Sequence, residues 1–576
     1  MDTEIIQKAE SWLNGPYDEE TKKEIRSIMQ TNEQELTDRF YRNLEFGTGG
    51  LRGVIGAGTN RMNIYTVAMA TQGLANYCKK CFQDKEQIKA VIAYDSRRFS
   101  REFADVAADV FSANGIFVYL FDDLRPTPEL SFAVRHLTCT TGIVITASHN
   151  PPEYNGYKVY WNDGAQITAP HDKNIIGEVN LISHYGMVKR DRDTALIKKI
   201  STEVDTAYLK AVKSLSLNTE CIKSHSNISI VYSPIHGSGI TAVPASLKNF
   251  GFTNVHILES QSVPDGNFPT VKKPNPEEQD AMKLACEKAA EIGAELVLAT
   301  DPDADRVGIA VKDLHGAFTL LNGNQTGSLI IFYLLSAWKK SGKLTGKEYV
   351  VKTIVTTDLI KKIADSFNVD CINVLTGFKY IAEIIGKNEG KRQFIGGGEE
   401  SYGYLAGEFV RDKDAVIACS LIAEMCAWAK ENKKTLFEVL LGIYARYGFY
   451  YEKLISITKK GKSGVEEIQN MMKNLQKNPP EKLGGKNAVI IRDYAKSVET
   501  DCRSKKTAPI TLPKSAVLQF ELEDGSIVTA RPSGTEPKIK FYCSVKTTFS
   551  HPDDYETKTP ELETYINAIL TDLGAV

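Results

Sequence analysis

Short apolar runs recur along most of this chain, with stretches of helical spacing between them. Four of the runs, at residues 88–94, 142–145, 296–299 and 349–355, have the length and composition of buried strands. A helix-like stretch at residues 107–111 follows the first of them. Strands that alternate with helices in this way build doubly wound sheets, so the pattern predicts repeated α/β domains.

The last part of the chain has a different pattern. Apolar residues alternate at period two over residues 539–545, as in a half-buried antiparallel strand, and residues 526–529 form its expected partner across one turn. Helical spacing over residues 562–573 predicts a closing amphipathic helix. We therefore predict three similar, doubly wound mixed α/β domains and a smaller α+β C-terminal domain around a central cleft. Their expected limits are residues 1–206, 207–322, 323–450 and 451–576.

A candidate nucleophile lies in the loop at residues 146–151, Thr-Ala-Ser-His-Asn-Pro, directly after the apolar run at residues 142–145. A parallel strand here would place Ser148 at its carboxyl end, where open α/β sheets bind their ligands. Ser, Asn and Pro also form ordinary turns. The loop by itself therefore indicates either an exposed nucleophile or a strand-ending turn.

Three aspartates alternate in the loop at residues 301–306, between two apolar runs: Asp301, Asp303 and Asp305. Three carboxylates in one turn repel each other, and a divalent cation would relieve this repulsion. Ligands of oxygen alone favour Mg²⁺, Mn²⁺ or Ca²⁺. An EF-hand is excluded because its sixth and twelfth positions need Gly and Glu, where this chain has Arg306 and Lys312. The loop predicts a metal site that faces a phosphorylated group, and a solvated acidic turn is the alternative.

Two further loops carry polar side chains after apolar runs. At residues 396–403, three glycines allow close backbone approach, and Glu399 and Ser401 suit the hydroxyl groups of a sugar. At residues 531–538, Arg531 with two hydroxyls and a glycine amide suits a phosphate. A glycine hinge and an ordinary hairpin connection are the respective alternatives.

These four loops, in this order, resemble those of the α-D-phosphohexomutase superfamily, which contains phosphoglucomutases and phosphomannomutases. The resemblance covers essentially the whole chain. Other matching segments lie at residues 46–53, 94–97, 155–158, 233–237, 274–277 and 376–379. One such motif is weak, whereas the ordered set is highly specific. Residues 156–166 are most similar to the branch that contains the phosphoglucomutase-2 type.

The resemblance implies an isomerase with a phosphorylated serine. Ser148 would carry the phosphoryl group, which completes the coordination of one Mg²⁺ per chain held by Asp301, Asp303 and Asp305. The group passes to a sugar monophosphate, and the bisphosphate that forms turns over and returns its other phosphate to the serine. Glucose 1,6-bisphosphate would be both the intermediate and an activator.

The resemblance also implies roles for the cationic side chains near the reaction. Arg52, Lys158 and Arg306 would neutralise the transferring phosphate. Lys158 matches a position proposed as general acid/base, which requires cationic surroundings that lower its pKa toward neutrality. His149 is expected to anchor the phosphate or the loop and not to act as the base of Ser148, because neighbouring side chains usually diverge.

The remaining matches would hold the far end of the substrate. Glu399 and Ser401 would contact the ring hydroxyls, and Lys379 would face the same cleft. The distal phosphate would be held by Arg531, Ser533, Gly534 and Thr535. Residues 398–403 read Gly-Glu-Glu-Ser-Tyr-Gly, where mannose-tolerant members commonly have Gly-Glu-Met-Ser-Gly-His. We therefore expect interconversion of glucose 1-phosphate and glucose 6-phosphate, with phosphopentomutase and phosphomannomutase activities as alternatives.

Composition agrees with a large globular enzyme. The 576 residues suit several domains, and 42% hydrophobic with 25% charged residues is typical of soluble proteins. The net charge of -2 gives no nucleic-acid footprint, and no apolar stretch is long enough for a membrane helix. The acidic start does not resemble a signal peptide, and ten scattered cysteines suit a reducing cytoplasm. The expected partners are small sugar phosphates, not nucleic acid or membrane, and the oligomeric state stays open.

Two functions of other classes compete with this hypothesis. A serine hydrolase could use Ser148 and His149, but the G-x-S-x-G elbow is missing, since Thr146 and Asn150 stand at the glycine positions. It would also leave the three aspartates without a role. A non-catalytic sugar-phosphate binding protein usually loses the nucleophile or a metal ligand, and neither is missing here.

Overall fold

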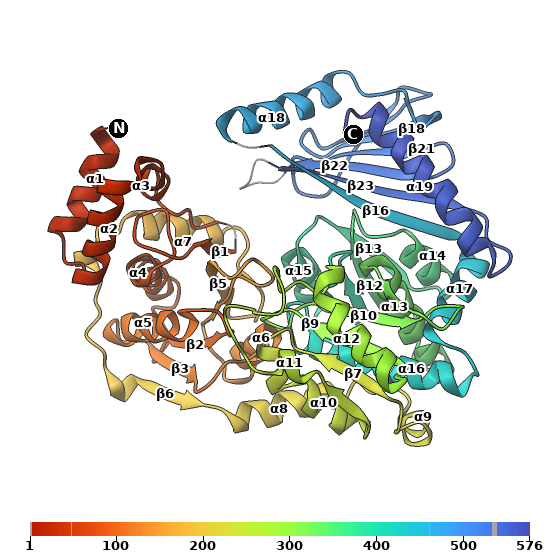
Figure 1. Cartoon of the computed structure of the whole chain (residues 1–576), viewed down its shortest axis with the longest axis horizontal. Helices are drawn as coiled ribbons and strands as arrows, with labels where there is room; N and C mark the ends of the chain where they lie inside the picture. The colour runs from red at the N-terminus through yellow and green to blue at the C-terminus, as the bar shows by residue number, and fades with distance from the viewer. Residues whose placement is uncertain (1–2, 48, 460, 533–537, 576) are drawn as a thin grey trace. The chain divides into compact units, whose positions relative to one another are not determined.

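The computed structural model describes residues 3–47, 49–459, 461–532 and 538–575. The chain divides into two compact units, each of which is made of several segments. The first unit contains Met1–Gly323, Ala382–Gly396 and Ser401–Asn432, and the second contains Asn324–Ile381, Gly397–Glu400 and Lys433–Val576. Within the described residues, four sheets with their helices build these units (Figure 1).

A six-stranded sheet forms the centre of the N-terminal region, in the order β1-β5-β4-β2-β3-β6. Its strands are β1 (Gly50–Val54), β2 (Lys89–Tyr94), β3 (Phe117–Phe121), β4 (Thr141–Ile145), β5 (Tyr154–Trp161) and β6 (Ile197–Ile200). β4 is buried throughout and runs parallel to β2, whereas β5 pairs antiparallel with both β4 and β1. The predicted buried parallel strand before Ser148 is therefore confirmed.

Helices surround this sheet, and a separate helical cluster precedes it. The helices are α1 (Thr3–Asn14), α2 (Glu19–Thr31), α3 (Glu33–Phe40), α4 (Ile64–Cys81), α5 (Ser100–Ala113), α6 (Thr127–His136) and α7 (His171–Asn180), with 3-10 turns at Tyr185–Met187 and Thr194–Leu196. α5 and α6 pack against β2. α1 to α3 form a small apolar core around Trp12, Ile25 and Phe40, to which Tyr65 of α4 also contributes.

The second sheet has five strands in the order β11-β10-β9-β7-β8. They are β7 (Ile230–Ser233), β8 (Val255–Ile257), β9 (Leu296–Thr300), β10 (Val307–Lys312) and β11 (Phe318–Leu321). Its helical elements are α8 (Thr202–Lys213), α9 (Thr219–Ser224), η3 (Ser238–Thr241), α10 (Val243–Phe250), α11 (Glu259–Ser262) and α12 (Gln279–Ile292). β9 is fully buried and runs antiparallel to β10. The acidic loop at residues 301–306 is therefore the connection of a buried hairpin.

The third sheet has the order β13-β12-β14-β15. Its strands are β12 (Glu348–Thr353), β13 (Asp370–Val374), β14 (Gln393–Gly398) and β15 (Tyr404–Ala406), and the helices of this region are α13 (Gly323–Lys340), α14 (Leu359–Ser366), α15 (Phe378–Asn388), α16 (Ala415–Glu431) and α17 (Leu436–Tyr447). The three glycines expected in a loop instead end strand β14. A Cβ atom at Gly397 would lie 2.3 Å from the carbonyl oxygen of Val351 in β12. The close backbone approach at Gly397 is therefore to another strand of the sheet.

The C-terminal sheet is antiparallel, with the strand order β16-β23-β22-β21-β18-β19-β20 and β17 paired to β18. Its elements are β16 (Phe449–Thr458), α18 (Gly461–Lys477), β17 (Lys482–Leu483), β18 (Lys486–Asp493), β19 (Val498–Asp501), β20 (Thr507–Pro509), β21 (Leu518–Leu522), β22 (Ile527–Pro532), β23 (Lys538–Thr547) and α19 (Asp554–Asp572). α19 packs on β16 and β23 (Figure 1). The predicted antiparallel strands and closing helix are confirmed.

Within the second unit, the C-terminal sheet packs against the residues that directly follow β12 and β13. A shared apolar cluster contains Ile354, Val355 and Leu375 from one side and Tyr494, Val517 and Tyr542 from the other. Gln519 Nε2 also donates to the carbonyl oxygen of Ile354 at 3.0 Å. In the described part of the chain, no helix is both long and apolar enough to cross a membrane.

Candidate metal and phosphoserine site

Ser148 lies directly beyond the buried end of β4, in a constrained backbone conformation. Its φ is 54°, in the left-handed region that few residues other than glycine adopt. Its amide donates to Thr146 Oγ1 at 2.8 Å, and its hydroxyl donates to Asp301 Oδ2 at 2.8 Å. The candidate nucleophile therefore contacts the acidic loop directly, although the two are separated by more than 150 residues.

A buried arginine holds the loop that carries Ser148. The guanidinium group of Arg97 donates to four backbone carbonyl oxygens of this loop, those of Ser148 (2.6 Å), Asn150, Pro151 (2.8 Å) and Tyr154 (3.0 Å). Asp95 accepts a hydrogen bond from Thr146 Oγ1 at 2.6 Å and lies 3.4 Å from Arg97 Nε. Both charged side chains are fully buried. The planar fork of an arginine suits this set of acceptors, and it fixes the loop at both ends.

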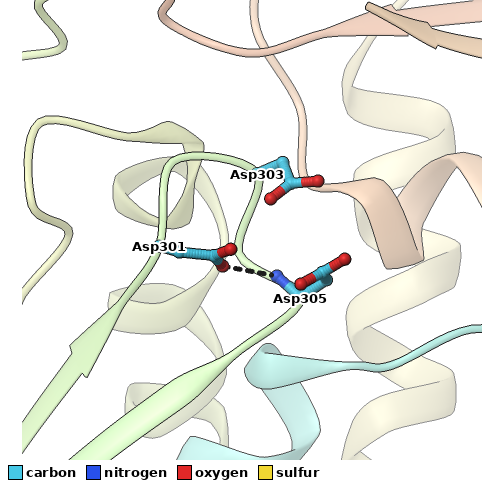
Figure 2. Close-up of side chains that lie close together, drawn as sticks. All are labelled: Asp301, Asp303 and Asp305. Atoms are coloured by element: carbon cyan, nitrogen blue, oxygen red, sulfur yellow. Dashed lines mark hydrogen bonds between the residues drawn. The ribbon is translucent and has the colours of Figure 1, made fainter. Parts of the chain in front are cut away.

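The acidic loop folds back on itself between β9 and β10 (Figure 2). Asp301 Oδ1 accepts hydrogen bonds from the amides of Asp305 (3.1 Å) and Arg306 (3.0 Å). Ala304 has a φ of 50°, which turns the chain between the second and third carboxylates. One oxygen from each of the three aspartates lies within 4.8 Å of the others, and all three side chains are buried.

Three consecutive carbonyl groups of this loop are each held by a different element of the first unit. Ser238 of η3 donates to the oxygen of Pro302 through its amide (2.7 Å) and its hydroxyl (2.8 Å). The amide of Thr127, at the start of α6, donates to the oxygen of Asp303 at 2.8 Å. The amide of Ala415, at the start of α16, donates to the oxygen of Ala304 at 3.2 Å. The backbone of the loop is therefore fixed by its surroundings.

Two lysines contact the cluster, and two of its carboxylate oxygens accept no hydrogen bond among the described residues. Lys158 Nζ lies 2.6 Å from Asp303 Oδ2 and 3.3 Å from Asp305 Oδ2, and Lys413 Nζ lies 3.1 Å from Asp305 Oδ2. Among the atoms that the structure describes, Asp303 Oδ1 and Asp305 Oδ1 are buried without a hydrogen-bond partner. Buried carboxylate oxygens rarely stay unsatisfied, and hard cations such as Mg²⁺ bind such oxygens. The residues present therefore fit a divalent cation.

The charges of the cluster shift its pKa values in opposite directions. Burial, together with the charges of Asp303 and Asp305, raises the pKa of Asp301 well above its usual value. Burial also opposes ionisation of Asp305, but Lys413 and Lys158 outweigh it and lower the pKa of that carboxyl. The carboxyl groups of Asp301 and Asp305 therefore have pKa values shifted in opposite directions, although both belong to the same cluster.

The surroundings of Lys158 differ from the expectation. Burial lowers the pKa of Lys158, but the adjacent carboxylates of Asp303 and Asp305 outweigh burial, and the pKa is raised. The prediction that cationic neighbours lower this pKa is wrong for the arrangement seen, because the groups that contact the ammonium are anionic. Lys158 therefore holds its proton firmly in this arrangement.

His149 also differs from the expectation. Its Nδ1 lies 3.2 Å from Ser148 Oγ, so the two neighbouring side chains converge instead of diverging. Burial, followed by the charges of Arg306 and Arg52, lowers the pKa of His149 well below its usual value. The imidazole is therefore neutral near pH 7 and can exchange a hydrogen bond with the serine hydroxyl. Arg52 itself is exposed on β1, opposite Gly156 in the strand register.

Two other predicted residues, Arg306 and Ser401, lie in or next to segments that contact the acidic loop. Arg306 Nη1 lies 2.5 Å from Glu277 Oε1, in the segment at residues 274–277. Ser401 precedes Tyr402, whose carbonyl oxygen accepts a hydrogen bond from the amide of Val307 at 3.1 Å. The residue after Ser401 is therefore bonded to the first residue of β10, which directly follows the acidic loop, and both belong to the first unit.

The remaining predicted residues belong to the second unit or lie outside the described residues. Glu399 is buried and accepts a hydrogen bond from the amide of Gly377 at 2.9 Å. Lys379 Nζ lies 5.4 Å from the ring centroid of Tyr380. Arg531 is in β22, opposite Lys540. Ser533, Gly534 and Thr535 lie outside the described residues.

The sequence reasoning did not single out Arg97, Thr127 or Lys413. Lys413 lies in the charged segment at residues 411–414, directly before the buried helix α16. A run of charges next to a buried helix is unusual, and this signal could have identified it. Arg97 was part of a recognised segment without an assigned role. Thr127, between two prolines, has no distinctive signal.

Comparison with known protein families gives three consecutive matches. The matching family models describe the α/β/α domains I, II and III of phosphoglucomutase/phosphomannomutase. They match residues 43–185, 206–316 and 322–447, respectively. Together they cover well over half of the chain.

Similar proteins extend the match over nearly the whole chain. A phosphoglucomutase of Staphylococcus haemolyticus is 36% identical over 528 residues, which cover 92% of this chain and 94% of that protein. A phosphoglucomutase of Staphylococcus aureus is 38% identical over 520 residues, covering 90% and 92%.

Solved structures share the fold at lower identity. The open form of pp63/parafusin, a phosphoglucomutase from Paramecium, has a TM-score of 0.70 at 19% identity and covers 93% of this chain and 95% of its own. A phosphoglucomutase/phosphomannomutase family protein from Burkholderia thailandensis has a TM-score of 0.64 at 16% identity, covering 92% and 97%. The similarity to the phosphoglucomutase-2 type stays a prediction. With matching domain models and relatives above 30% identity along nearly its full length, the chain belongs to the phosphoglucomutase/phosphomannomutase family.

Proposed function

We propose that this chain interconverts glucose 1-phosphate and glucose 6-phosphate through a phosphorylated Ser148 and glucose 1,6-bisphosphate. The observation that carries this proposal is the hydrogen bond from Ser148 Oγ to Asp301 Oδ2 within the buried aspartate cluster. It brings the candidate nucleophile to a site that fits a divalent cation. The names of the staphylococcal relatives support the choice of reaction.

Asp301, Asp303 and Asp305 would hold one Mg²⁺, which supplies charge neutralisation to the oxygens of the transferring phosphoryl group. The bond between phosphorus and Ser148 Oγ breaks as a bond to the sugar hydroxyl forms, and the second half of the cycle reverses this exchange with the other phosphate. Arg52 and Arg306 add positive charge near His149, which indicates a cationic environment next to Ser148. Positioning and charge account for most catalysis of this kind.

Each transfer also moves a proton. Ser148 loses its hydroxyl proton when it receives the phosphoryl group and regains it when the group leaves. Two groups lie within reach of that proton: Asp301 Oδ2, which accepts a hydrogen bond from the hydroxyl at 2.8 Å, and His149 Nδ1, 3.2 Å from Ser148 Oγ. We assign the proton of the sugar hydroxyl to Lys158, whose ammonium is held by Asp303 and Asp305 until those charges are neutralised.

Glu399 and Ser401 are assigned to the ring hydroxyls of the sugar. Lys379, Arg531, Ser533, Gly534 and Thr535 are assigned to the distal phosphate. The segment Gly-Glu-Glu-Ser-Tyr-Gly at residues 398–403 supports glucose over mannose. A carboxylate and a hydroxyl are suited to ring hydroxyls, and an arginine fork is suited to a phosphate.

The test is a Mg²⁺-dependent mutase assay on wild type, Ser148→Ala and a matched control, Ser112→Ala. Ser112 is equally buried, but its hydroxyl donates to the carbonyl oxygen of Asp109. With glucose 1-phosphate and a trace of glucose 1,6-bisphosphate, we expect Ser148→Ala to lose about 10⁴-fold or more in kcat, as removal of a nucleophile does. Intact mass should show one phosphoryl group on wild type and on Ser112→Ala only.

The same assay separates the alternatives. Faster turnover of mannose 1-phosphate or ribose 1-phosphate would keep the mechanism and change the substrate. Turnover that survives a chelator would favour a hydrolase and contradict the proposed role of the aspartates. A folded wild type without turnover on any of the three sugars would favour a binding protein.

A further inference from the structure

The two carboxylate oxygens of Asp303 have different surroundings. Oδ2 accepts hydrogen bonds from Thr127 Oγ1 at 2.8 Å and from Lys158 Nζ at 2.6 Å. Oδ1 is buried and has no hydrogen-bond partner in the part of the chain that the structure describes. The donors on Oδ2 therefore decide which way Oδ1 points.

Thr127 holds Asp303 at two points. Its hydroxyl bonds the carboxylate, and its amide donates to the carbonyl oxygen of the same residue at 2.8 Å. Both side chains are completely buried. Because one residue grips the backbone and the side chain of Asp303 together, the carboxylate cannot rotate without breaking one of these bonds. Threonine is stiff at χ1, which strengthens this restriction.

The position of Thr127 is itself fixed. It opens helix α6 between Pro126 and Pro128, whose rings restrict the backbone. Two residues earlier, Arg125 forms a two-pronged ion pair with Asp205 of α8, with N–O distances of 2.8 and 3.0 Å. The start of α6 is thus anchored to the same unit that carries the acidic loop.

The two side chains that donate to Asp303 Oδ2, those of Thr127 and Lys158, have different effects on a cation bound nearby. Lys158 carries a positive charge, so it competes electrostatically with a bound cation. Thr127 is neutral, so it can fix the carboxylate without this repulsion. Donors that orient a metal-binding side chain typically change metal affinity 10–100-fold when they are removed, by rough magnitude.

We propose that Thr127 is a positioning residue that turns Asp303 Oδ1 toward a bound divalent cation. This inference rests on the proposed function, in which Asp301, Asp303 and Asp305 bind the metal. It adds a residue from a distant segment, which makes cation affinity depend on the start of helix α6.

The test measures Mg²⁺ and Mn²⁺ binding to the full-length, dephosphorylated protein by calorimetry. The variants are Thr127→Val, Thr127→Ser and Asp303→Asn, with Thr141→Val as the control. Thr141 is equally buried and its hydroxyl donates to the carbonyl oxygen of Tyr160, away from the acidic loop. We expect Thr127→Val to raise the Kd for the cation about 10–100-fold. Thr127→Ser, which keeps the hydroxyl, should restore most of the affinity.

A second readout uses turnover as a function of Mg²⁺ concentration. Thr127→Val should need more Mg²⁺ for half-maximal rate, while KM for the sugar phosphate at saturating Mg²⁺ stays near that of wild type. A merely structural role would not produce this split. If circular dichroism shows that Thr127→Val is unfolded, Thr127→Ala is used instead. This variant removes the hydroxyl without adding a methyl group.

The outcomes separate the inference from the proposed function. Equal cation binding by wild type and Asp303→Asn would overturn the metal assignment itself. Loss of binding in Asp303→Asn, with wild-type affinity in Thr127→Val, would overturn only the role of Thr127. A similar loss in Thr141→Val, or no rescue by Thr127→Ser, would also overturn it, because the effect would then be general loosening.

Discussion

The residues assigned to the reaction and those assigned to recognition are built differently. The residues assigned to the reaction belong to one compact unit and are buried, and they bond in pairs: Ser148 donates to Asp301, and Lys158 forms an ion pair with Asp303. The recognition residues are divided, with Ser401 in the first unit and Glu399, Lys379 and Arg531 in the second. The comparison teaches that the residues assigned to the chemistry are held together by packing within one unit, whereas the residues assigned to recognition are divided between the sequence segments of both.

The largest effect is expected when the loop that carries Ser148 loses its support while the nucleophile itself is unchanged. Arg97→Lys keeps the charge but cannot donate to four carbonyl groups at once. A displacement of the loop by about 1 Å costs on the order of 100-fold in rate, so we expect a loss of about that size in kcat. The measurement is steady-state turnover of glucose 1-phosphate with saturating Mg²⁺.

Arg98→Lys is the matched control for this variant. Arg98 is the next residue and is exposed, with one hydrogen bond of 3.3 Å to the carbonyl oxygen of Pro152. It should keep nearly full kcat. Normal kcat in Arg97→Lys would mean that the backbone of the serine loop holds its shape without the guanidinium, and the comparison would lose its main support.

A smaller effect is expected at the recognition end. Arg531→Ala should raise KM for glucose 1-phosphate about 10-fold or more, because a charged hydrogen bond contributes on the order of 1.5–3 kcal/mol. Its kcat should change much less, since the residue is assigned to the non-reacting phosphate. Initial rates over a range of substrate concentrations separate the two constants.

Arg503→Ala is the control, because Arg503 is an exposed arginine of the same C-terminal sheet region. It should leave both constants unchanged. A large fall in kcat of Arg531→Ala with unchanged KM would move Arg531 to the reacting end and erase the contrast between the two groups.

The smallest effect on turnover is expected at Asp414, which supports the acidic loop indirectly. Its carboxylate accepts hydrogen bonds from the amides of Val416 and Ile417 and from the hydroxyl of Tyr208, at 2.9, 3.0 and 2.9 Å. Burial outweighs these bonds and raises the pKa of Asp414 to about 6. Asn at this position keeps the acceptor and removes the charge.

The raised pKa sets the direction of a pH effect. As pH rises from about 4 to about 6, an unfolded chain releases this proton before the folded one does, so folded wild type loses about 3 kcal/mol of stability from this group. The melting temperature of Asp414→Asn should therefore rise relative to wild type between pH 4 and pH 7. A constant difference across this range would show that the carboxyl is not perturbed in the folded protein.

Much of the fold could be predicted because the burial of a strand determines which of its positions are apolar. The apolar runs at residues 142–145 and 296–299 became the fully buried strands β4 and β9, since strands covered on both faces need apolar residues at every position. The period-two pattern at residues 539–545 likewise became part of β23. The predicted domain limits stay predictions.

The candidate site was predictable only where its residues are close in sequence or match the family. The alternating aspartates at residues 301–306 carry their own signal, because three carboxylates in one turn need a counter-charge. Thr127 is 176 residues from Asp303, and nothing near it in the sequence records that contact. The environment of Lys158 was misjudged for the same reason. Its contacts with Asp303 and Asp305 are set by the tertiary fold, not by neighbours in the sequence.

The three carbonyl groups of Pro302, Asp303 and Ala304 also constrain how the protein is made. Their donors are Ser238, Thr127 and Ala415, which come from widely separated parts of the chain. During synthesis the acidic loop leaves the ribosome more than a hundred residues before Ala415. The loop therefore cannot form all three hydrogen bonds until α16 has been synthesised. A shortened product that ends before that helix would contain every aspartate but would lack their final arrangement.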